Sequence, residues 1–350
     1  MTTLITGATG FVGSHVARLL AARGHQVRAL VRSPGRSNAL DGIPCERVTG
    51  DLTDPPSLER ALRGVRRVFH VAADYRLWAR DPAEIYRSNV EGTRNLISIA
   101  VAAGVERIVY TSTVATVAVP VENGHLPDES TEARFEQMIG HYKRSKFIAE
   151  REVMEAAREG APVVIVNPTA PVGPGDWKPT PTGRIVLDFL KGRMPAFVDT
   201  GLNVVAVEDV AAGHLLAADR GKPGERYILG GRNMTLEEIL TELAWITGRT
   251  APRIRLPHAV ALAAAWTDTA VCRLLRREPH IPLDGVRMAR HRMFVDSSKA
   301  ERELGFKAGP IAAALERAVR WYQTRDAVRG NAASSAHPEQ PVAGSTMRAA

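Results

Sequence analysis

Cysteine is scarce in this 350-residue sequence, which contains only Cys45 and Cys272. Two cysteines without the spacing of metal ligands exclude a disulfide framework and a structural zinc site. This usage is typical of a reducing compartment, so we expect a cytoplasmic protein with no metal site. Aromatic residues make up 5% of the chain, and zinc-finger spacings, aromatic RNA-binding motifs and basic arms are lacking. The sequence therefore predicts no nucleic-acid partner.

Long hydrophobic runs are also lacking. The most apolar stretch, 259–275, is interrupted by Asp268 and carries Arg273, so it is too short and too polar to span a bilayer. We expect a buried helix or a lid helix there, and at most peripheral contact with a membrane. No signal-peptide pattern precedes the first strand-like run at Thr3, so export by that route is not expected. The net charge of +8 is spread over scattered arginines, which favours an anionic small-molecule ligand.

Residues 3–166 alternate short aliphatic runs with longer amphipathic stretches. This alternation is typical of βαβ units around a parallel sheet. The sequence therefore predicts an α/β fold, a Rossmann doubly wound parallel sheet with a smaller C-terminal α/β substrate lobe. The expected strands are 4–6, 27–31, 68–71, 108–110 and 163–166.

Three regions are expected along the chain. Residues 1–168 mainly form the dinucleotide-binding domain, and residues 169–325 mainly form the substrate lobe, where a Pro/Gly-rich loop and short elements replace the regular alternation. The lobe should include helices starting near Thr235 and Pro257 and an isolated strand-like run at 226–229. Residues 326–350 are rich in Ala, Ser, Gly and Pro without apolar periodicity, so this tail is expected to be disordered.

Three glycines follow the first strand at G-x-x-G-x-x-G spacing and open a helix. Gly7 suits a tight turn, Gly10 lets a pyrophosphate approach the backbone, and Gly13 allows the helix to pack closely on the strand. The helix N-terminus adds free N–H groups and a partial positive charge. The alternative is a plain flexible turn, but the following second strand favours a dinucleotide site. Its predicted residues are Gly7, Thr9, Gly10, Phe11, Val12 and Gly13.

The end of the second strand carries Arg32, where NAD-binding proteins usually have an acidic residue for the ribose hydroxyl. With Arg28 and Arg36 close by in sequence, Arg32 suits the 2′-phosphate of NADP(H). We therefore favour NADP(H) over NAD(H) as the cofactor. The alternative is a solvated surface arginine.

Asp51 and Leu52 follow the short run 45–48. The Asp51 carboxylate could accept a hydrogen bond from the adenine amine of the cofactor. Alternatively, Asp51 only caps the helix that begins near Asp54.

Tyr142 and Lys146 lie four residues apart in a helical pattern, 141–156, so their side chains share one face. A neighbouring ammonium and a cationic nicotinamide favour a tyrosine phenolate, which can exchange a proton with a carbinol or carbonyl oxygen. The spacing alone is only suggestive, and the surroundings strengthen it.

A hydroxyl-rich cluster of Thr111, Ser112 and Thr113 ends the strand 108–110, at the carboxyl edge where open α/β sheets bind ligands. Ser112 or Thr113 could hydrogen-bond the reacting oxygen. The alternative is local bonding between these hydroxyls and the backbone. The predicted catalytic residues are Tyr142, Lys146, Thr113 and Ser112.

Taken together, these motifs resemble those of extended short-chain dehydrogenases/reductases, the NAD-dependent epimerase/dehydratase family, over residues 1–325. Three further segments resemble bacterial hopanoid-associated sugar epimerases, which are relatives of dihydroflavonol 4-reductases: 73–78, 179–184 and 224–231. The motifs that carry the family resemblance are the glycine turn, 51–52, 70–73, 89–93, 111–113, Tyr142-x-x-x-Lys146 and 167–168.

The resemblance implies an NAD(P)-binding Rossmann core, a substrate cleft between this core and the C-terminal lobe, and a homodimer. It assigns Asn89 a structural role beside the cofactor. Outside the glycine turn, the cofactor-binding residues predicted from the motifs and the resemblance are Arg32, Asp51, Leu52, Ala72, Ala73, Asn89, Thr111, Lys146, Asn167 and Pro168. One departure concerns Ala206, where relatives often carry a histidine, so no imidazole contact with substrate is expected there.

Three functions stay open on the sequence. A sugar epimerase, hopanoid-linked by resemblance, would return hydride to the same substrate from tightly bound NAD. An NADPH-dependent carbonyl or sterol-type reductase would exchange its cofactor at each turnover, and a non-catalytic redox sensor would need only NAD(P) binding. Dehydration is not expected, because Val114 and Ala115 stand where dehydratases of the family have an Asp-Glu pair. Candidate contacts with the small-molecule substrate are Trp78, Arg184 and Arg226, each of which also suits a structural role.

Overall fold

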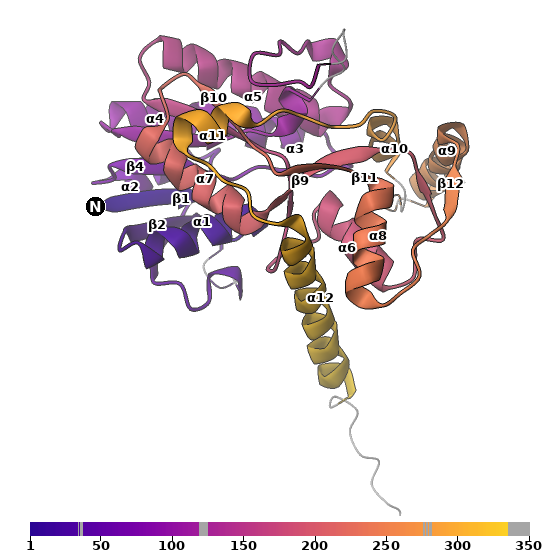
Figure 1. Ribbon diagram of the computed structural model, residues 1–350. Coiled ribbons are helices and arrows are strands. Elements are labelled where there is room, and N and C mark those ends of the chain that lie inside the picture. Colours follow the sequence, from indigo (N-terminus) through magenta and orange to yellow (C-terminus); the bar gives the residue numbers. More distant parts are fainter. Residues whose placement is uncertain are drawn as a thin grey trace, which may run out of the picture.

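The computed structural model describes residues 1–33, 35, 38–118, 125–275, 277, 279 and 282–334. Its centre is a seven-stranded sheet with the order β10-β6-β5-β4-β1-β2-β3, and all of its strand pairs are parallel (Figure 1). The chain turns back between β1 and β4, which is the switch point of a doubly wound sheet. The predicted Rossmann fold is confirmed. The strands are β1 (Thr2–Thr6), β2 (Gln26–Val31), β3 (Cys45–Thr49), β4 (Arg67–His70), β5 (Arg107–Thr111), β6 (Val163–Pro168) and β10 (Arg226–Leu229).

Helices bury both faces of this sheet. Successive strand residues point to opposite faces, so Leu4 and Ile5 of β1 belong to two separate hydrophobic cores. Parallel sheets covered in this way have strands that are apolar on both sides, which explains the continuous aliphatic runs in the sequence. Helices α1 (Phe11–Ala22), α7 (Val207–Arg220) and α11 (Ser298–Leu304) line one core, and α2 (Pro55–Leu62), α4 (Gly92–Ala102) and α5 (Gly140–Arg158) line the other.

Strand β10 corrects one expectation about the C-terminal half. The run 226–229 was expected to be an isolated strand of the substrate lobe, but Arg226 to Leu229 pair in parallel with Ile165 to Pro168 at the edge of the central sheet. Tyr227 and Leu229 are completely buried there. The Rossmann sheet is therefore completed by a segment that follows the substrate lobe's first elements in sequence.

The second lobe has smaller sheets covered by helices. A three-stranded sheet has the order β11-β9-β7, and β12 pairs with β8. Its strands are β7 (Ala170–Val172), β8 (Ala196–Val198), β9 (Gly201–Ala206), β11 (Arg232–Thr235) and β12 (Ile254–Leu256). Its main helices are α6 (Pro181–Leu190), α8 (Leu236–Thr247), α9 (His258–Leu274), α10 (Leu283–Met288) and α12 (Ile311–Ser334). The helix starts expected near Thr235 and Pro257 are confirmed, because these residues are the N-caps of α8 and α9.

Short helical turns join the larger elements. Residues 83–91 include α3 (Ala83–Tyr86) and a π-helical turn, η2 (Arg87–Glu91), which continues directly into α4. The further short turns among the described residues are η1 (Asn38–Leu40), η3 (Val114–Thr116) and η5 (Phe135–Gln137).

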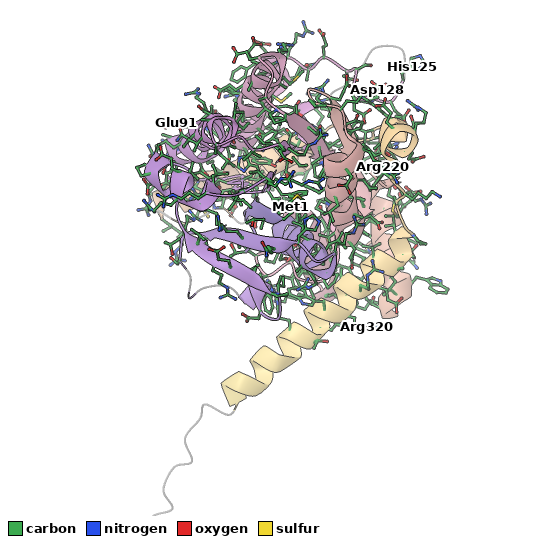
Figure 2. All side chains as sticks on the ribbon, turned by 90° about the vertical axis from the view of Figure 1, so that its left-hand side faces the viewer. Met1, Glu91, His125, Asp128, Arg220 and Arg320 are labelled. Atoms are coloured by element: carbon green, nitrogen blue, oxygen red, sulfur yellow. The ribbon has the colours of Figure 1, made fainter. Side chains whose placement is uncertain are left out.

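Two further expectations change in the C-terminal region. Helix α12 extends to Ser334, so residues 326–334, expected to be disordered, are helical; Figure 2 shows α12, with Arg320, projecting from the body of the protein. The rest of that tail, 335–350, lies outside the described residues. Helix α9 buries only Ala265 and Cys272, so it is not the buried helix that its apolar sequence suggested. No helix among the described residues is long and apolar enough to cross a membrane.

Two buried histidines make the stability of this fold sensitive to pH. His70 binds the hydroxyls of Thr6 and Thr93 at 2.8 and 2.9 Å, and His214 binds Thr111 Oγ1 and the Val210 carbonyl at 2.9 and 2.7 Å. Burial lowers the pKa of His70 to about 3 and that of His214 to about 4. Both values lie below the ordinary 6.5, so the folded protein holds these imidazoles neutral.

We predict that the free energy of unfolding falls as the pH is lowered from 7 to 5. Over this range the unfolded chain binds protons at these histidines and the folded chain does not, which costs about 2 kcal/mol for each histidine. Urea unfolding of the wild type at both pH values, beside His70→Gln and His214→Gln, measures the difference. Each variant should lose part of the pH dependence, and an unchanged dependence in both would contradict the assignment.

Candidate active site

The turn from β1 to α1 is sterically closed on one side. Gly7 has a φ of +70°, and a Cβ added there would lie 2.5 Å from the Ala72 nitrogen. A Cβ on Gly13 would lie 2.1 Å from the Gly7 carbonyl oxygen. Only glycine fits either position, so these two residues have the turn-forming and packing roles expected from the sequence.

The other side of the same turn is open. Gly10 is exposed, and a Cβ added there would meet only the Gly7 carbonyl oxygen, at 3.2 Å. Gly10 is also the N-cap of α1, whose first turn has neither a side-chain cap nor an acidic residue. The first N–H groups of a helix have no partner within the helix. The backbone around Gly10 therefore fits the pyrophosphate of a dinucleotide, which these N–H groups and the helix dipole would stabilise.

The arginines near the end of β2 separate into different roles. Arg32 is exposed and forms no ion pair within the described residues. Arg28, by contrast, pairs with Glu46 at 2.7 Å and donates to the carbonyls of Ala61 and Arg63. Arg28, although close to Arg32 in sequence, is therefore not available to a 2′-phosphate, because its guanidinium is already used within the protein. Arg36 lies outside the described residues.

Asp51 makes a local turn and does not cap a helix. Its Oδ1 accepts hydrogen bonds from the backbone and the hydroxyl of Thr53, at 2.9 and 2.7 Å. The N-cap of α2 is Asp54, so the capping alternative for Asp51 is not found. Leu52 is buried in the core against Gly92. A Cβ added to Gly92 would lie 2.7 Å from the Cβ of Leu52.

Helix α5 brings Lys146 to the carboxyl end of β5. Lys146 Nζ donates to the Tyr110 phenol and to the Thr111 carbonyl, both at 2.8 Å. The side chain is almost completely buried, and burial lowers its pKa to about 7. An ammonium has three N–H donors, so one remains for a ligand.

Tyr142 lies one turn before Lys146 on α5 and is only half-buried. Burial raises the pKa of its phenol, and the neighbouring Thr113 hydroxyl lowers it to a smaller extent. Within the described residues the Lys146 ammonium binds Tyr110 and the Thr111 carbonyl, so the ammonium part of the expected stabilisation of the Tyr142 phenolate is not found in this structure.

The three hydroxyls at the end of β5 have different partners. Thr111 Oγ1 contacts His214 Nε2 at 2.9 Å, and Thr113 Oγ1 accepts from the Ala115 backbone at 3.2 Å, so local bonding holds for Thr113. Ser112 Oγ is buried without a hydrogen-bond partner among the described residues. A buried hydroxyl without a partner is costly, which fits a position that a ligand completes.

Asn89 links the segment after β4 to helix α5. Its side chain accepts from the Asp74 backbone nitrogen at 2.7 Å and donates to the Asp74 carbonyl at 2.8 Å and to Ser145 Oγ at 3.0 Å. The segment after β4, with half-buried Ala72 and Ala73, is thereby fixed to α5. Asn89 lies in the π-helical turn η2.

Glu150, which sequence reasoning missed, lies one turn after Lys146 on α5. Its carboxylate accepts from Thr116 Oγ1 at 2.9 Å and from Asn167 Nδ2 at 2.8 Å, and it pairs with Arg226 at 3.1 Å. Asn167 also donates to the Thr113 carbonyl at 3.0 Å. The network therefore fixes the turn that carries Thr113. The i, i+4 spacing from Lys146 is the sequence signal that could have identified Glu150.

Arg226 is not a substrate contact as its sequence context suggested. Its side chain is 15% exposed, and besides Glu150 it binds the carbonyls of Glu129 and Thr131. The guanidinium joins β10 to α5 and to the segment at 129–131. Arg184, on α6, is exposed and stays a candidate.

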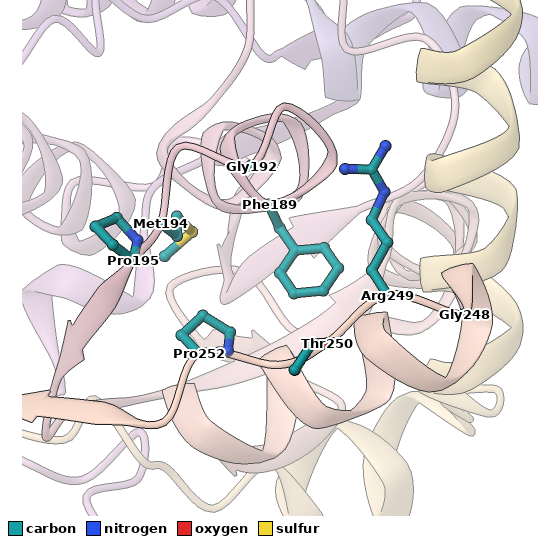
Figure 3. Close-up of a pocket in the computed structure, with 8 residues that line it drawn as sticks. All are labelled: Phe189, Gly192, Met194, Pro195, Gly248, Arg249, Thr250 and Pro252. Atoms are coloured by element: carbon teal, nitrogen blue, oxygen red, sulfur yellow. The ribbon is translucent and has the colours of Figure 1, made fainter.

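Two surface hollows are lined by residues outside this cluster. One, about 530 Å³, includes Trp78, Arg80 and Arg273 in its lining. Figure 3 shows the other, about 470 Å³, between the ends of α6 and α8, with Phe189 and Arg249. Among the described residues that line it, none is a predicted site residue, so it is not the candidate active site.

Comparison with known proteins agrees with this arrangement. Residues 3–230 match the model of the NAD dependent epimerase/dehydratase family. A putative dihydroflavonol 4-reductase of Synechocystis is 48% identical, over 93% of this chain and 95% of the relative. Sterol demethylase protein B of Methylococcus capsulatus is 40% identical, over 93% and 99%. The crystal structure of a nucleoside-diphosphate-sugar epimerase from Pseudomonas aeruginosa matches with a TM-score of 0.76 at 29% identity, over 93% of this chain and 98% of that chain.

The fold and the site thus define an NAD(P)-dependent oxidoreductase or epimerase with a Rossmann domain. The chain belongs to the NAD-dependent epimerase/dehydratase family, the extended short-chain dehydrogenases/reductases.

We predict that Glu150→Gln lowers the free energy of unfolding by about 3 kcal/mol, because it leaves the buried Arg226 guanidinium without a counter-charge. Glu152→Gln, two residues along the same helix, is the matched control. Glu152 pairs with Arg94 at the surface, where side-chain exposures are 30% and 59%, so its loss should cost at most about 1 kcal/mol. Urea denaturation of both variants measures the difference, and equal losses would refute the structural importance of the buried pair.

Proposed function

We propose that the protein is an NADPH-dependent reductase of a carbonyl group on an apolar small molecule. The observation that carries this proposal is the placement of the half-buried Tyr142 phenol on α5, next to the Thr113 hydroxyl and near the unpartnered Ser112 hydroxyl at the end of β5. Reduction of a carbonyl needs a proton donor at oxygen, and a tyrosine phenol can serve as one. The names of two relatives, a putative dihydroflavonol 4-reductase and a sterol demethylase protein, support an apolar substrate.

In this reaction the residues at the carboxyl edge of the central sheet have separate roles. When bound, the cofactor supplies hydride to the carbonyl carbon. Tyr142 donates its proton to the carbonyl oxygen, so the product is an alcohol. Ser112 Oγ, which has no other partner among the described residues, binds the same oxygen. Lys146, held by Tyr110 and the Thr111 carbonyl, offers its remaining N–H to the cofactor ribose.

Other residues would hold the rest of the cofactor. The N-terminus of α1, from Thr9 to Gly13, binds the pyrophosphate, and Arg32 binds the 2′-phosphate of the adenosine. Asp51, Ala72, Ala73, Asn167 and Pro168 stay predicted cofactor neighbours, and Trp78 and Arg184 stay predicted substrate neighbours. The cytoplasmic location and the homodimer are also proposals.

A sugar epimerase is the second candidate, because the Pseudomonas epimerase structure matches nearly the whole chain at 29% identity. An epimerase of this kind, including a hopanoid-linked one, would be isolated with NAD that does not exchange. Release of the nucleotide from purified protein, identified by mass, separates the two functions. Bound, non-exchanging NAD would favour the epimerase, and exchange of NADPH would favour the reductase.

We predict that Arg32→Ala raises the Kd for NADPH about tenfold or more, because a charge-assisted contact with the 2′-phosphate is lost. NADH binding should not change. Arg66→Ala is the control, since Arg66 is an exposed arginine that pairs with Glu106 before the start of β4. Nicotinamide fluorescence titration measures the affinities of the wild type and of both variants for NADPH and for NADH. Equal affinity of the wild type for NADPH and NADH would refute the role of Arg32.

We predict that Tyr142→Phe lowers kcat for carbonyl reduction by about 10²- to 10⁴-fold, because the proton donor is removed. The Kd for NADPH should stay the same. Tyr86→Phe is the control, as its phenol contacts His141 at 3.2 Å on the exposed side of the same region. If Tyr142→Phe kept full turnover, the catalytic role would be wrong. A cellular effect that survives the substitution would favour the non-catalytic redox sensor.

A further inference from the structure

The solvent-facing side of α9 is apolar. Val260, Trp266, Val271 and Leu274 have exposed fractions of 52%, 54%, 49% and 84%, and Leu275 follows at 57%. Among the exposed residues of this helix, Arg273 is the only charged one. A surface helix of a globular protein normally turns charged and polar side chains to water. Helix α9 does the opposite along most of its length.

The exposed residues form one continuous surface. Positions 260, 264, 267, 271 and 274 recur at helical spacing, so they lie on one face. Ala265 and Cys272 lie on the opposite face and are the buried residues of the helix. The fold therefore packs one side of α9 and leaves an apolar strip uncovered. We call this strip, Val260 to Leu275, the α9 face.

The sequence on either side of α9 is rich in positive charge. Residues 249–292 contain nine arginines and three acidic residues, which accounts for most of the net charge of +8. Arg80, Arg273 and Arg277 line a hollow of about 530 Å³ beside α9, together with Trp78 and Thr269. These three arginines form no ion pair within the described part of the chain. Their guanidinium groups are free to bind anions.

We propose that the α9 face docks on a membrane surface of anionic phospholipid. The apolar side chains enter the boundary between headgroups and acyl chains, and the arginines of the hollow bind lipid phosphates. Trp266 suits this boundary because its ring is apolar and its N–H is polar. A second copy of the chain fits less well, because it would present the same positive charge.

The size and place of the helix agree with docking on a membrane. Helix α9 has 17 residues and lies at the edge of the C-terminal lobe, on the far side from β1 and α2 (Figure 1). A helix of this length is about 25 Å long, enough to lie along a membrane surface. The proposal does not depend on the reaction, because neither Tyr142 nor Lys146 belongs to the α9 face or lines the hollow, which shares only Trp78 with the predicted substrate neighbours.

Cosedimentation of the full chain with vesicles tests the apolar part. Wild type should bind phosphatidylglycerol vesicles and bind pure phosphatidylcholine weakly. Val271→Asp should reduce binding about tenfold or more, because a carboxylate resists transfer to the interface. Val101→Asp is the matched control, since Val101 is 43% exposed on α4 and Val271 is 49% exposed on α9. Equal binding by the two variants, or no binding by wild type to either vesicle, would overturn the proposal.

A second pair of variants tests the charge. Arg273→Gln with Arg277→Gln should weaken binding to phosphatidylglycerol, and added salt should weaken it further. Arg302→Gln on α11 is the control. If neither the arginine substitutions nor added salt weakened binding to the vesicles, the proposed contact between the arginines and lipid phosphates would be overturned. Size-exclusion chromatography without lipid tests whether the α9 face instead joins two copies of the chain. If the wild type formed an oligomer that Val271→Asp abolished, the α9 face would be a contact between copies, and membrane docking would be overturned.

Discussion

One buried carboxylate, that of Glu150, holds the candidate active site of this protein together. It joins α5 to the turn after β5 through Thr116, to β6 through Asn167 and to β10 through Arg226. These elements come from four separate parts of the sequence. A buried charge is tolerated only when partners surround it, so the carboxylate and its partners require one another. The turn with Thr113 and the strand that completes the sheet are fixed by the same group.

Helix α5 carries several of the side chains discussed above on one face, because residues three or four positions apart in a helix are neighbours on its surface. Tyr142, Ser145, Lys146 and Glu150 follow in this order. Ser145 receives a hydrogen bond from Asn89, Lys146 donates to Tyr110, and Glu150 binds Arg226. Three of these four are therefore used to position the helix or its neighbours, and Tyr142 is left half-buried at the edge of the sheet. This arrangement gives Tyr142 a fixed place without using its phenol in the scaffold.

The arginines of this protein fall into two groups: some are bonded within the protein, and others are available to ligands. Arg28 and Arg226 bind carboxylates and backbone carbonyls within the protein. Arg32, Arg273 and Arg277 form no ion pairs within the described residues, and they lie at the end of β2 and beside α9. Guanidinium groups left without a partner are available for anionic ligands. The phosphate of a cofactor and the phosphates of a lipid surface are the two ligands that these positions suit.

The sequence by itself determined the Rossmann sheet, the glycine turn and the helix that carries both Tyr142 and Lys146, because each depends on local periodicity or on steric limits of a few adjacent residues. It also determined the steric roles of Gly7 and Gly13. Only the tertiary structure decided that β10 joins the central sheet, that Arg226 is structural and that Lys146 faces Tyr110. These outcomes depend on contacts between residues far apart in the chain, such as the 76 positions that separate Glu150 from Arg226. The exposed side of α9 was likewise decided by packing, because an apolar sequence does not specify which of its faces the fold will cover.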